Sequence, residues 1–181
     1  VVPDGRRVDL EVDRGCQQLK GENFVNDGKQ LVYHEQENGK RIQWHTLSVP
    51  RGGEYKLVLA DGTRVWLNAA SELMYPDHFS ADQRKVVLKG EAYFEVTKDV
   101  KRPFSVVLGD MEVKVLGTSF NVSAYPGVKR QTTLIEGQVA VNWHRQQVVI
   151  RPGQQAAETD EGLRVASVNV MNYVGWKEHR F

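Results

Sequence analysis

The strongest constraint on the fold is an Asp-Gly pair, Asp61-Gly62, that lies between two runs of alternating apolar and polar residues. Such a pair in this setting is a strong local signal for a tight turn between two antiparallel strands. Similar turns are predicted at Asp4-Gly5, Asn38-Gly39 and Glu161-Gly162, each followed by strand-like residues. Their spacing is irregular, so the chain repeats a turn chemistry and not a strict sequence unit.

Short segments rich in β-branched and aromatic residues follow one another along the chain. They are residues 31–33, 42–44, 85–88, 92–96, 104–108, 111–116, 120–122, 138–141 and 148–150. We expect little helix: one turn at 69–73 that stops before Pro76, and the start of a helix or linker at 172–177. The pattern predicts an all-β fold of short strands in a twisted solenoid-like stack, with a two-sheet sandwich as the alternative. The strands should be mainly antiparallel, because parallel crossovers would need helices that the pattern lacks.

Composition narrows the class of protein. The 181 residues carry a formal net charge of +1, which gives no strong field for nucleic acid or an anionic membrane. We interpret the scattered basic doublets, Arg84-Lys85 among them, as solvated faces. The single cysteine, Cys16, excludes an intramolecular disulfide, and no apolar run approaches the ~20 residues of a membrane span. The chain begins abruptly at Val1, within strand-like sequence, so we expect an excised piece of a longer protein.

No known catalytic motif is present. A nucleophile elbow and a phosphate-binding glycine loop are missing, and the five histidines form no closely spaced pair. Glu91 and Glu95 flank Tyr93 on one face of a predicted strand, which suggests a glycosidase. Four residues along a strand separate the two backbones by ~13 Å, whereas paired catalytic carboxylates lie ~5 to 9.5 Å apart. We therefore predict no enzyme activity and no cofactor or metal, and we expect a polar face around a half-buried Tyr93.

The four tryptophans offer a second alternative. Exposed aromatic rings on a β-scaffold can stack on sugars, so Trp66 and Trp143 could form the platform of a secreted carbohydrate-binding module. Trp66 alternates with Val65 and Leu67, which face the other way. Packing in a core or against another domain is the favoured interpretation of these rings.

The order of the motifs resembles the extracytoplasmic region of FecR-family anti-sigma factors. From Leu59 to Phe181 they are LADGTRVWLNAASELMYP, RKVVLKGEAYFEV, RPFSVV, MEVKVLGTSFNVSAY, TTLIEGQVAV, IRPGQQA and YVGWKEHRF. The most specific parts are residues 90–96 and 116–122. Residues 1–50 resemble the stretch that precedes this block in longer family members.

This resemblance implies a function that composition does not. Family members are single-pass inner-membrane proteins whose cytoplasmic N-terminal domain holds an extracytoplasmic-function sigma factor. Their periplasmic part relays ligand occupancy of a TonB-dependent outer-membrane transporter, through contact with the transporter's N-terminal signalling domain.

The resemblance also divides the chain and marks a set of residues. Residues 1–50 are a β-rich N-terminal part, 51–168 the FecR-type β-domain, and 169–181 a linker or the truncated start of a C-terminal α/β domain expected to meet the transporter. The family-signature residues are Gly90, Glu91, Gly117, Thr118, Phe120, Asn121, Glu136 and Gly137. We interpret them as structural: the glycines serve tight turns, Phe120 serves the core, and Asn121 or Thr118 bonds to turn backbones.

Overall fold

A computed structural model describes residues 1, 24–26, 30–34 and 41–178 of the chain. Cys16 and the predicted turns at Asp4-Gly5 and Asn38-Gly39 lie outside the described residues. The strands are β1 (Phe24–Asn26), β2 (Gln30–Tyr33), β3 (Trp44–Ser48), β4 (Tyr55–Val58), β5 (Arg64–Leu67), β6 (Glu72–Pro76), β7 (Arg84–Glu95), β8 (Phe104–Leu108), β9 (Met111–Val115), β10 (Ser119–Ala124), β11 (Gln131–Glu136), β12 (Val139–Trp143), β13 (Gln146–Ile150), β14 (Gln154–Thr159) and β15 (Gly162–Ser167). The chain then forms the short helix α1 (Met171–Val174) and the 3-10 turn η1 (Gly175–Glu178).

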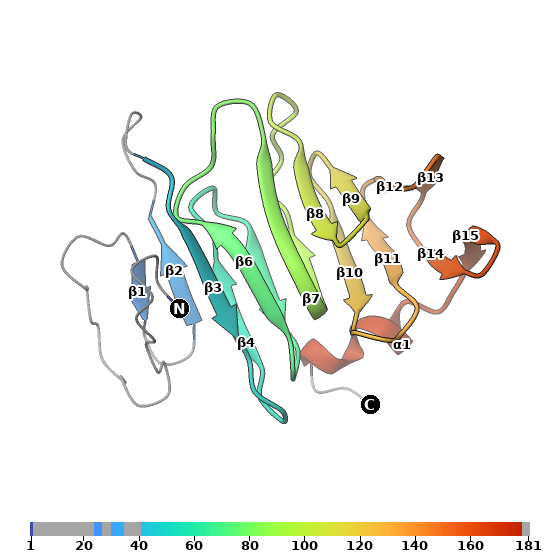
Figure 1. The fold of residues 1–181 in the computed structure, drawn as a ribbon, viewed down its shortest axis with the longest axis horizontal. Coiled ribbons are helices and arrows are strands. Elements are labelled where there is room, and N and C mark those ends of the chain that lie inside the picture. Colours follow the sequence, from blue (N-terminus) through green and yellow to red (C-terminus); the bar gives the residue numbers. More distant parts are fainter. Residues whose placement is uncertain (2–23, 27–29, 35–40, 179–181) are drawn as a thin grey trace.

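The strands form one hydrogen-bonded sheet that folds into two layers at β7 (Figure 1). Layer A has the order β1-β2-β4-β5-β7-β10-β11-β14-β15, and layer B the order β3-β6-β7-β8-β9-β12-β13. The first half of β7 pairs with β6 and β8, and its second half pairs with β5 and β10. This one long strand therefore ties the layers together.

The chain moves stepwise along this structure, from one layer to the other and back. β8 and β9 form a hairpin in layer B, β10 and β11 one in layer A, β12 and β13 one in layer B, and β14 and β15 one in layer A. The predicted all-β, mainly antiparallel class is confirmed. Solenoid-like progression and two-layer packing, which the sequence left as alternatives, describe the same fold.

The core lies between the two layers. Phe94 of layer A stacks on Phe120 with ring centroids 5.2 Å apart and meets Phe104 of layer B edge-on at 6.1 Å. Burying aromatic rings of this size supplies much of the favourable free energy of a small β-protein. The Asp61-Gly62 turn joins β4 to β5 as predicted, and Gly62 has φ +84°, which a side chain would disfavour.

Two expectations about local structure are wrong. Residues 69–73 form no helical turn: Ala69 and Ala70 form a non-helical turn, with Ala70 at φ +56°, which leads into β6, where Leu73 and Tyr75 are fully buried at period two. Burial of alternate side chains outweighs the helix propensity of the alanines. The segments 85–88 and 92–96 are one strand and not two, since Gly90 bends β7 without breaking it.

Two strand pairs, β2–β4 and β7–β8, are parallel although the described residues between their strands form no helix. The reason given for a mainly antiparallel sheet is therefore incorrect. In the first pair the return path is β3, which lies in the other layer. In the second pair it is the far half of β7 with residues 96–103. The passage of the chain through the other layer replaces the crossover helix that usually connects parallel strands.

The expected helix near 172–177 is present as α1 and η1, which lie beside the lower ends of β10 and β11 in Figure 1. Among the described residues, neither helix has the length or apolar character of a membrane span.

Candidate functional site

The outer surface of layer A carries a connected polar cluster built around Glu91. The alternation of β7 turns Ala92 and Phe94 into the core and leaves Glu91, Tyr93 and Glu95 on the outer surface, as the sequence predicts. We call this surface of β5, β7 and β10 the signature face; its residues are Trp66, Asn68, Glu91, Tyr93, Glu95 and Asn121.

Glu91 holds the two neighbouring strands in register. Its Oε1 accepts a hydrogen bond from Asn121 Nδ2 and its Oε2 one from Asn68 Nδ2, both at 2.9 Å. The Glu91 amide donates to Ser71 Oγ at 2.9 Å. Hydrogen bonds to an ionised carboxylate are stronger than those between neutral groups. The carboxylate therefore connects β7 to β10 and to the residue that follows β5.

The C-terminal segment, residues 171–178, packs on the signature face and contacts Asn121, which also binds Glu91. The indole Nε1 of Trp176 donates a hydrogen bond to Asn121 Oδ1 at 3.2 Å, which uses the amide oxygen that Glu91 leaves free. Asn121 thus joins Glu91 on one side to Trp176 on the other. Val174, two residues earlier, is buried.

Lys177 makes the second contact of the segment. Its ammonium nitrogen lies 4.9 Å from the ring centroid of Trp66 and 4.4 Å from that of Tyr93, and 3.9 Å from a carboxylate oxygen of Glu95. Two aromatic rings and a carboxylate form a favourable site for a primary ammonium. Glu95 also pairs with Arg64 across the strands.

Tyr93 is covered by this arrangement and is only 5% exposed, so the expectation of a half-buried Tyr93 is wrong. Burial raises the pKa of its phenol, and the carboxylate of Glu95 adds to the increase. Tyr93 therefore stays neutral across the physiological range. Its ring packs edge-on against that of Trp66, with ring centroids 5.6 Å apart, and the ammonium of Lys177 lies over both rings.

The other signature residues lie in a second place, at the turns that follow β9 and β11. The Thr118 hydroxyl donates to the Gln138 carbonyl at 3.0 Å. Gly137 has φ +94°, and a Cβ there would lie 3.0 Å from the Gly117 carbonyl oxygen; one at Gly117 would lie 2.7 Å from Lys98 Cα. Glu136 is exposed at the end of β11 and Phe120 lies in the core.

The structure therefore divides the eight signature residues. Gly90, Glu91 and Asn121 support the outer surface, while Gly117, Thr118 and Gly137 pack a corner. Asn121 bonds to side chains and not to a turn backbone. Its contact with Trp176, 55 positions away, could not be read from the sequence.

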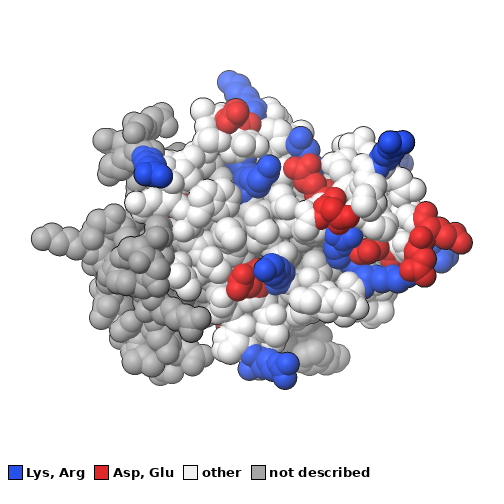
Figure 2. All heavy atoms as spheres, in the orientation of Figure 1, with Lys and Arg blue, Asp and Glu red and all other residues white. Residues whose placement is uncertain are grey.

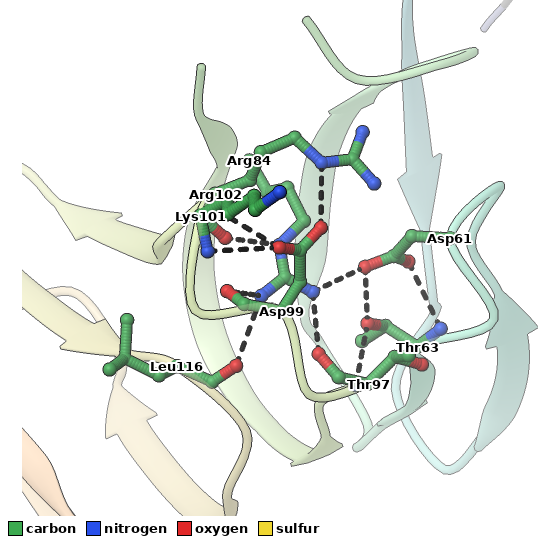
Figure 3. Close-up of polar contacts among 8 residues, drawn as sticks. All are labelled: Asp61, Thr63, Arg84, Thr97, Asp99, Lys101, Arg102 and Leu116. Carbon is green, nitrogen blue, oxygen red and sulfur yellow. Dashed lines mark hydrogen bonds and ion pairs between the residues drawn. The ribbon is translucent and has the colours of Figure 1, made fainter. Parts of the chain in front are cut away.

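A third cluster, drawn in Figure 3, surrounds Arg84. The Arg84 side chain is fully buried. Its Nη1 donates to Asp61 Oδ2 at 2.8 Å and to the Thr97 carbonyl at 2.7 Å, and its Nε donates to the Arg102 carbonyl at 2.7 Å. Nη2 reaches the Leu116 carbonyl at 3.2 Å. The interpretation of Arg84-Lys85 as a solvated doublet is thus wrong for Arg84. A guanidinium can satisfy several carbonyls at once, which a sequence pattern does not reveal.

Asp61 connects this cluster to the turn of the first hairpin. Its carboxylate accepts hydrogen bonds from the Thr63 amide at 3.0 Å and the Thr63 hydroxyl at 2.8 Å, besides that from Arg84. Nearby, a hydrogen bond from Arg102 holds the pKa of the Asp99 carboxyl below its ordinary value. Arg84 therefore fastens the Asp61-Gly62 turn to residues 97–103 and to the end of β9.

On the face shown in Figure 2, the charged side chains of the described residues are of both signs, mixed over the surface. Within the described residues, no three His, Cys, Asp or Glu side chains are grouped as metal ligands. Glu91 is bound by two amides and Glu95 by two cations. Both carboxylates are thus used in holding structure together.

Cationic side chains lie over the rings of both tryptophans that were proposed as a sugar platform. Lys56 and Arg64 lie 5.1 and 5.9 Å from the ring centroid of Trp66, in addition to Lys177. Arg130 lies 5.4 Å from that of Trp143, whose indole donates to Asp110 at 3.1 Å. Contact within the domain, the favoured interpretation, is what the structure shows.

Comparison with known proteins gives a family and two solved structures. A family model described as "FecR protein" matches residues 45–140. Two crystal structures from Parabacteroides distasonis ATCC 8503, described as a "putative anti-sigma factor", are 32% identical, with TM-scores of 0.72 and 0.71. The alignment covers 74% of this chain and 64% of theirs, so the chain spans less than two thirds of their length. No curated protein matches.

Proposed function

We propose that this chain, which belongs to the FecR family, is the periplasmic signal-transducing region of an anti-sigma factor. The whole protein would cross the inner membrane once. It would relay ligand occupancy of a TonB-dependent outer-membrane transporter to an extracytoplasmic-function sigma factor in the cytoplasm. We assign it no catalytic step and no cofactor.

The proposed division of labour follows the chain. Residues 51–168 form the FecR-type β-domain, residues 1–50 precede it on the side of the membrane anchor, and residues 169–181 begin the connection to a domain that meets the transporter's signalling domain. Sigma-factor binding belongs to a cytoplasmic domain outside this sequence. The stepwise two-layer fold suits a body that carries a displacement along its length.

One observation carries this proposal: the C-terminal segment docks on the signature face. Asn121 bonds to Glu91 with its amide nitrogen and accepts from Trp176 with its oxygen. A displacement of the segment would therefore be transmitted through Asn121 and Glu91 to β7, the strand that belongs to both layers. This gives the signature residues a common purpose, which is to couple the segment to the β-domain.

The test is sigma-dependent transcription in cells that carry the intact protein. Lys177→Met keeps most of the side-chain volume and removes the charge that the aromatic rings hold. We expect it to change the response to the transporter's ligand, with normal protein levels. Lys114→Met, on an exposed position of β9 away from this surface, is the matched control.

Two results would count against the proposal. The first is that deleting the gene leaves transporter-linked transcription unchanged and the intact protein binds no sigma factor. The second is a saturable change in tryptophan fluorescence on glycan titration, which favours the carbohydrate-binding alternative. The contacts of Trp66 and Trp143 with cations give that alternative no support.

A further inference from the structure

Layer A ends at β15, an exposed edge strand at the right of Figure 1. Within the described residues β15 pairs only with β14, and residues 164–167 are all exposed. Such an edge presents unpaired backbone groups to any further strand. Natural edges are commonly blocked by proline, by several charges or by a covering segment, but β15 has no proline and a single charged residue, Arg164.

The opposite end of the molecule provides a contrast. β3 is the first strand of layer B, and there the backbone of Val1 exchanges hydrogen bonds with Thr46, at 2.6 and 3.0 Å. The backbone of Val1 thus covers part of that edge. At the β15 end a side chain covers part of the edge: Gln146 Oε1 of β13 accepts a hydrogen bond from the Leu163 amide at 2.8 Å.

The hydrogen-bond pattern identifies the groups that face outward. The Val168 amide donates to the Gly153 carbonyl, so in the β14–β15 ladder the even-numbered residues of β15 turn their backbone groups toward β14. The Leu163 amide, bound to Gln146, confirms that odd-numbered residues turn away. The backbone groups of Val165 and Ser167 therefore lie at the open edge.

The side chain of Val165 lies at the open end of the space between the layers. Val165 is opposite Ala156, which is 2% exposed and points into the core. Cross-strand partners share a face of the sheet, so Val165 points the same way. It nevertheless remains 39% exposed, because among the described residues no strand pairs with β15 on that side. Another strand would bury an inward-facing apolar side chain as well as pair the backbone.

We propose that this edge pairs with the β15 of a second copy of the chain, antiparallel and about a two-fold axis at Val165. The two Val165 residues would exchange both backbone hydrogen bonds, and each Ser167 amide would donate to the Leu163 carbonyl of the other copy. Layer A would then continue from one copy into the next. This inference stands independently of the proposed function.

Self-pairing is favoured because one register satisfies three independent conditions. A two-fold axis at Val165 puts outward-facing backbone groups opposite each other and places apolar Val165 against its own copy. It also puts Arg164 opposite Ala166. An axis at Arg164 fails on two counts, since that residue turns its backbone groups toward β14 and its charge would directly oppose the same charge.

The test is disulfide cross-linking of the full chain in a Cys16→Ser background. Val165→Cys places the two thiols on the axis, where Cα atoms of a hydrogen-bonded pair are ~5.5 Å apart and a disulfide fits. Arg164→Cys is the matched control on the same strand, because its nearest copy is a diagonal neighbour ~7–8 Å away. Val149→Cys, 52% exposed on β13, controls for random collision.

We expect Val165→Cys to form the cross-linked dimer about tenfold faster than either control in a glutathione buffer, with a rate that rises with protein concentration. Adding Ser167→Pro, which removes the donor to Leu163, should slow that reaction. Equal rates for the three cysteine variants, or no dimer from Val165→Cys, would overturn the proposal. Circular dichroism of each variant shows whether it is folded. If the Val165→Cys protein is unfolded, sedimentation velocity of Val165→Thr beside wild type gives a second readout of the dimer.

Discussion

The Arg84 cluster and the signature face are both polar networks, but they join different things. Arg84 is fully buried and binds carbonyls of segments that belong to one domain. The signature face has Tyr93 and Asn121 buried and its other members half-buried, and it binds residues 171–178, which follow β15. A buried charge with several partners is costly to separate, whereas a few partly exposed contacts are not. The first network therefore fixes the fold, and the second permits a segment to move.

This contrast predicts that Arg84→Met is the most damaging single change. It leaves the Asp61 carboxylate, with a side chain 5% exposed, without its cation, and it leaves buried carbonyls unpaired. Breaking a buried pair by removing one partner typically costs about 3–5 kcal/mol. Urea unfolding measures the loss, and the neighbouring Lys85→Met should stay within about 0.5 kcal/mol of wild type. An Arg84→Met protein as stable as Lys85→Met would show that the cluster does not fix the fold.

Gly90→Ala should be the next largest effect, because β7 bends there. Gly90 has φ +100°, and a Cβ would lie 2.7 Å from the backbone Cα of Ser71. Gly127→Ala is the matched control, since its φ is +76° but nothing lies within 4 Å. We expect about 1–2 kcal/mol for the control from backbone strain alone, and a clearly larger loss at Gly90. Equal losses at the two glycines would remove the steric argument.

The contacts of the C-terminal segment should be weaker. In a double-mutant cycle that combines Lys177→Met with Trp66→Leu, we expect a coupling free energy of about 0.5–2 kcal/mol, the range for an ammonium over an aromatic ring. Urea unfolding of the four proteins gives this value. A coupling of zero would mean that the ammonium and the ring do not interact in solution.

The smallest effect concerns His45, which lies in the β3–β6 part of the core and bonds to Tyr33 through Nδ1 at 2.6 Å. Burial lowers its pKa below the ordinary value of about 6.5, although Asp77 opposes this. The unfolded chain then binds a proton more readily than the folded one. Stability should therefore decline as the pH falls below about 6.5.

The measurement is the difference in unfolding free energy between pH 7.5 and pH 5.5. His45→Gln keeps a hydrogen-bonding side chain but does not titrate, so its difference should be smaller than that of wild type. An equal difference would place the titrating group elsewhere.

The sequence was a good guide to features set by local chemistry and a poor one to features set by distant contacts. Asp61-Gly62 needs only its own neighbours to predict a hairpin, and the alternation of Glu91 to Val96 sorts core from surface. The helical turn expected at 69–73 is absent because Leu73 and Tyr75 pack in the core against strands distant in the sequence.

The contacts of the site depend on such distances entirely. Arg84 meets Asp61 and Leu116 at separations of 23 and 32 positions, and Trp176 meets Asn121 at 55. No periodicity carries that information, because the two-layer path brings strands together in an order that differs from the chain. The signature residues could be named from the motifs, but the shared contact of Glu91, Asn121 and Trp176 could not.

The central claim is that the signature face holds residues 171–178, and amide hydrogen exchange tests it most directly. We predict that the amides of this segment are protected in wild type, and that Trp176→Phe with Lys177→Met makes them exchange faster while β7 is unchanged. Protection that is lost in the segment alone would establish a detachable contact. A segment that is unprotected in wild type, or equally protected in the double variant, would contradict the account.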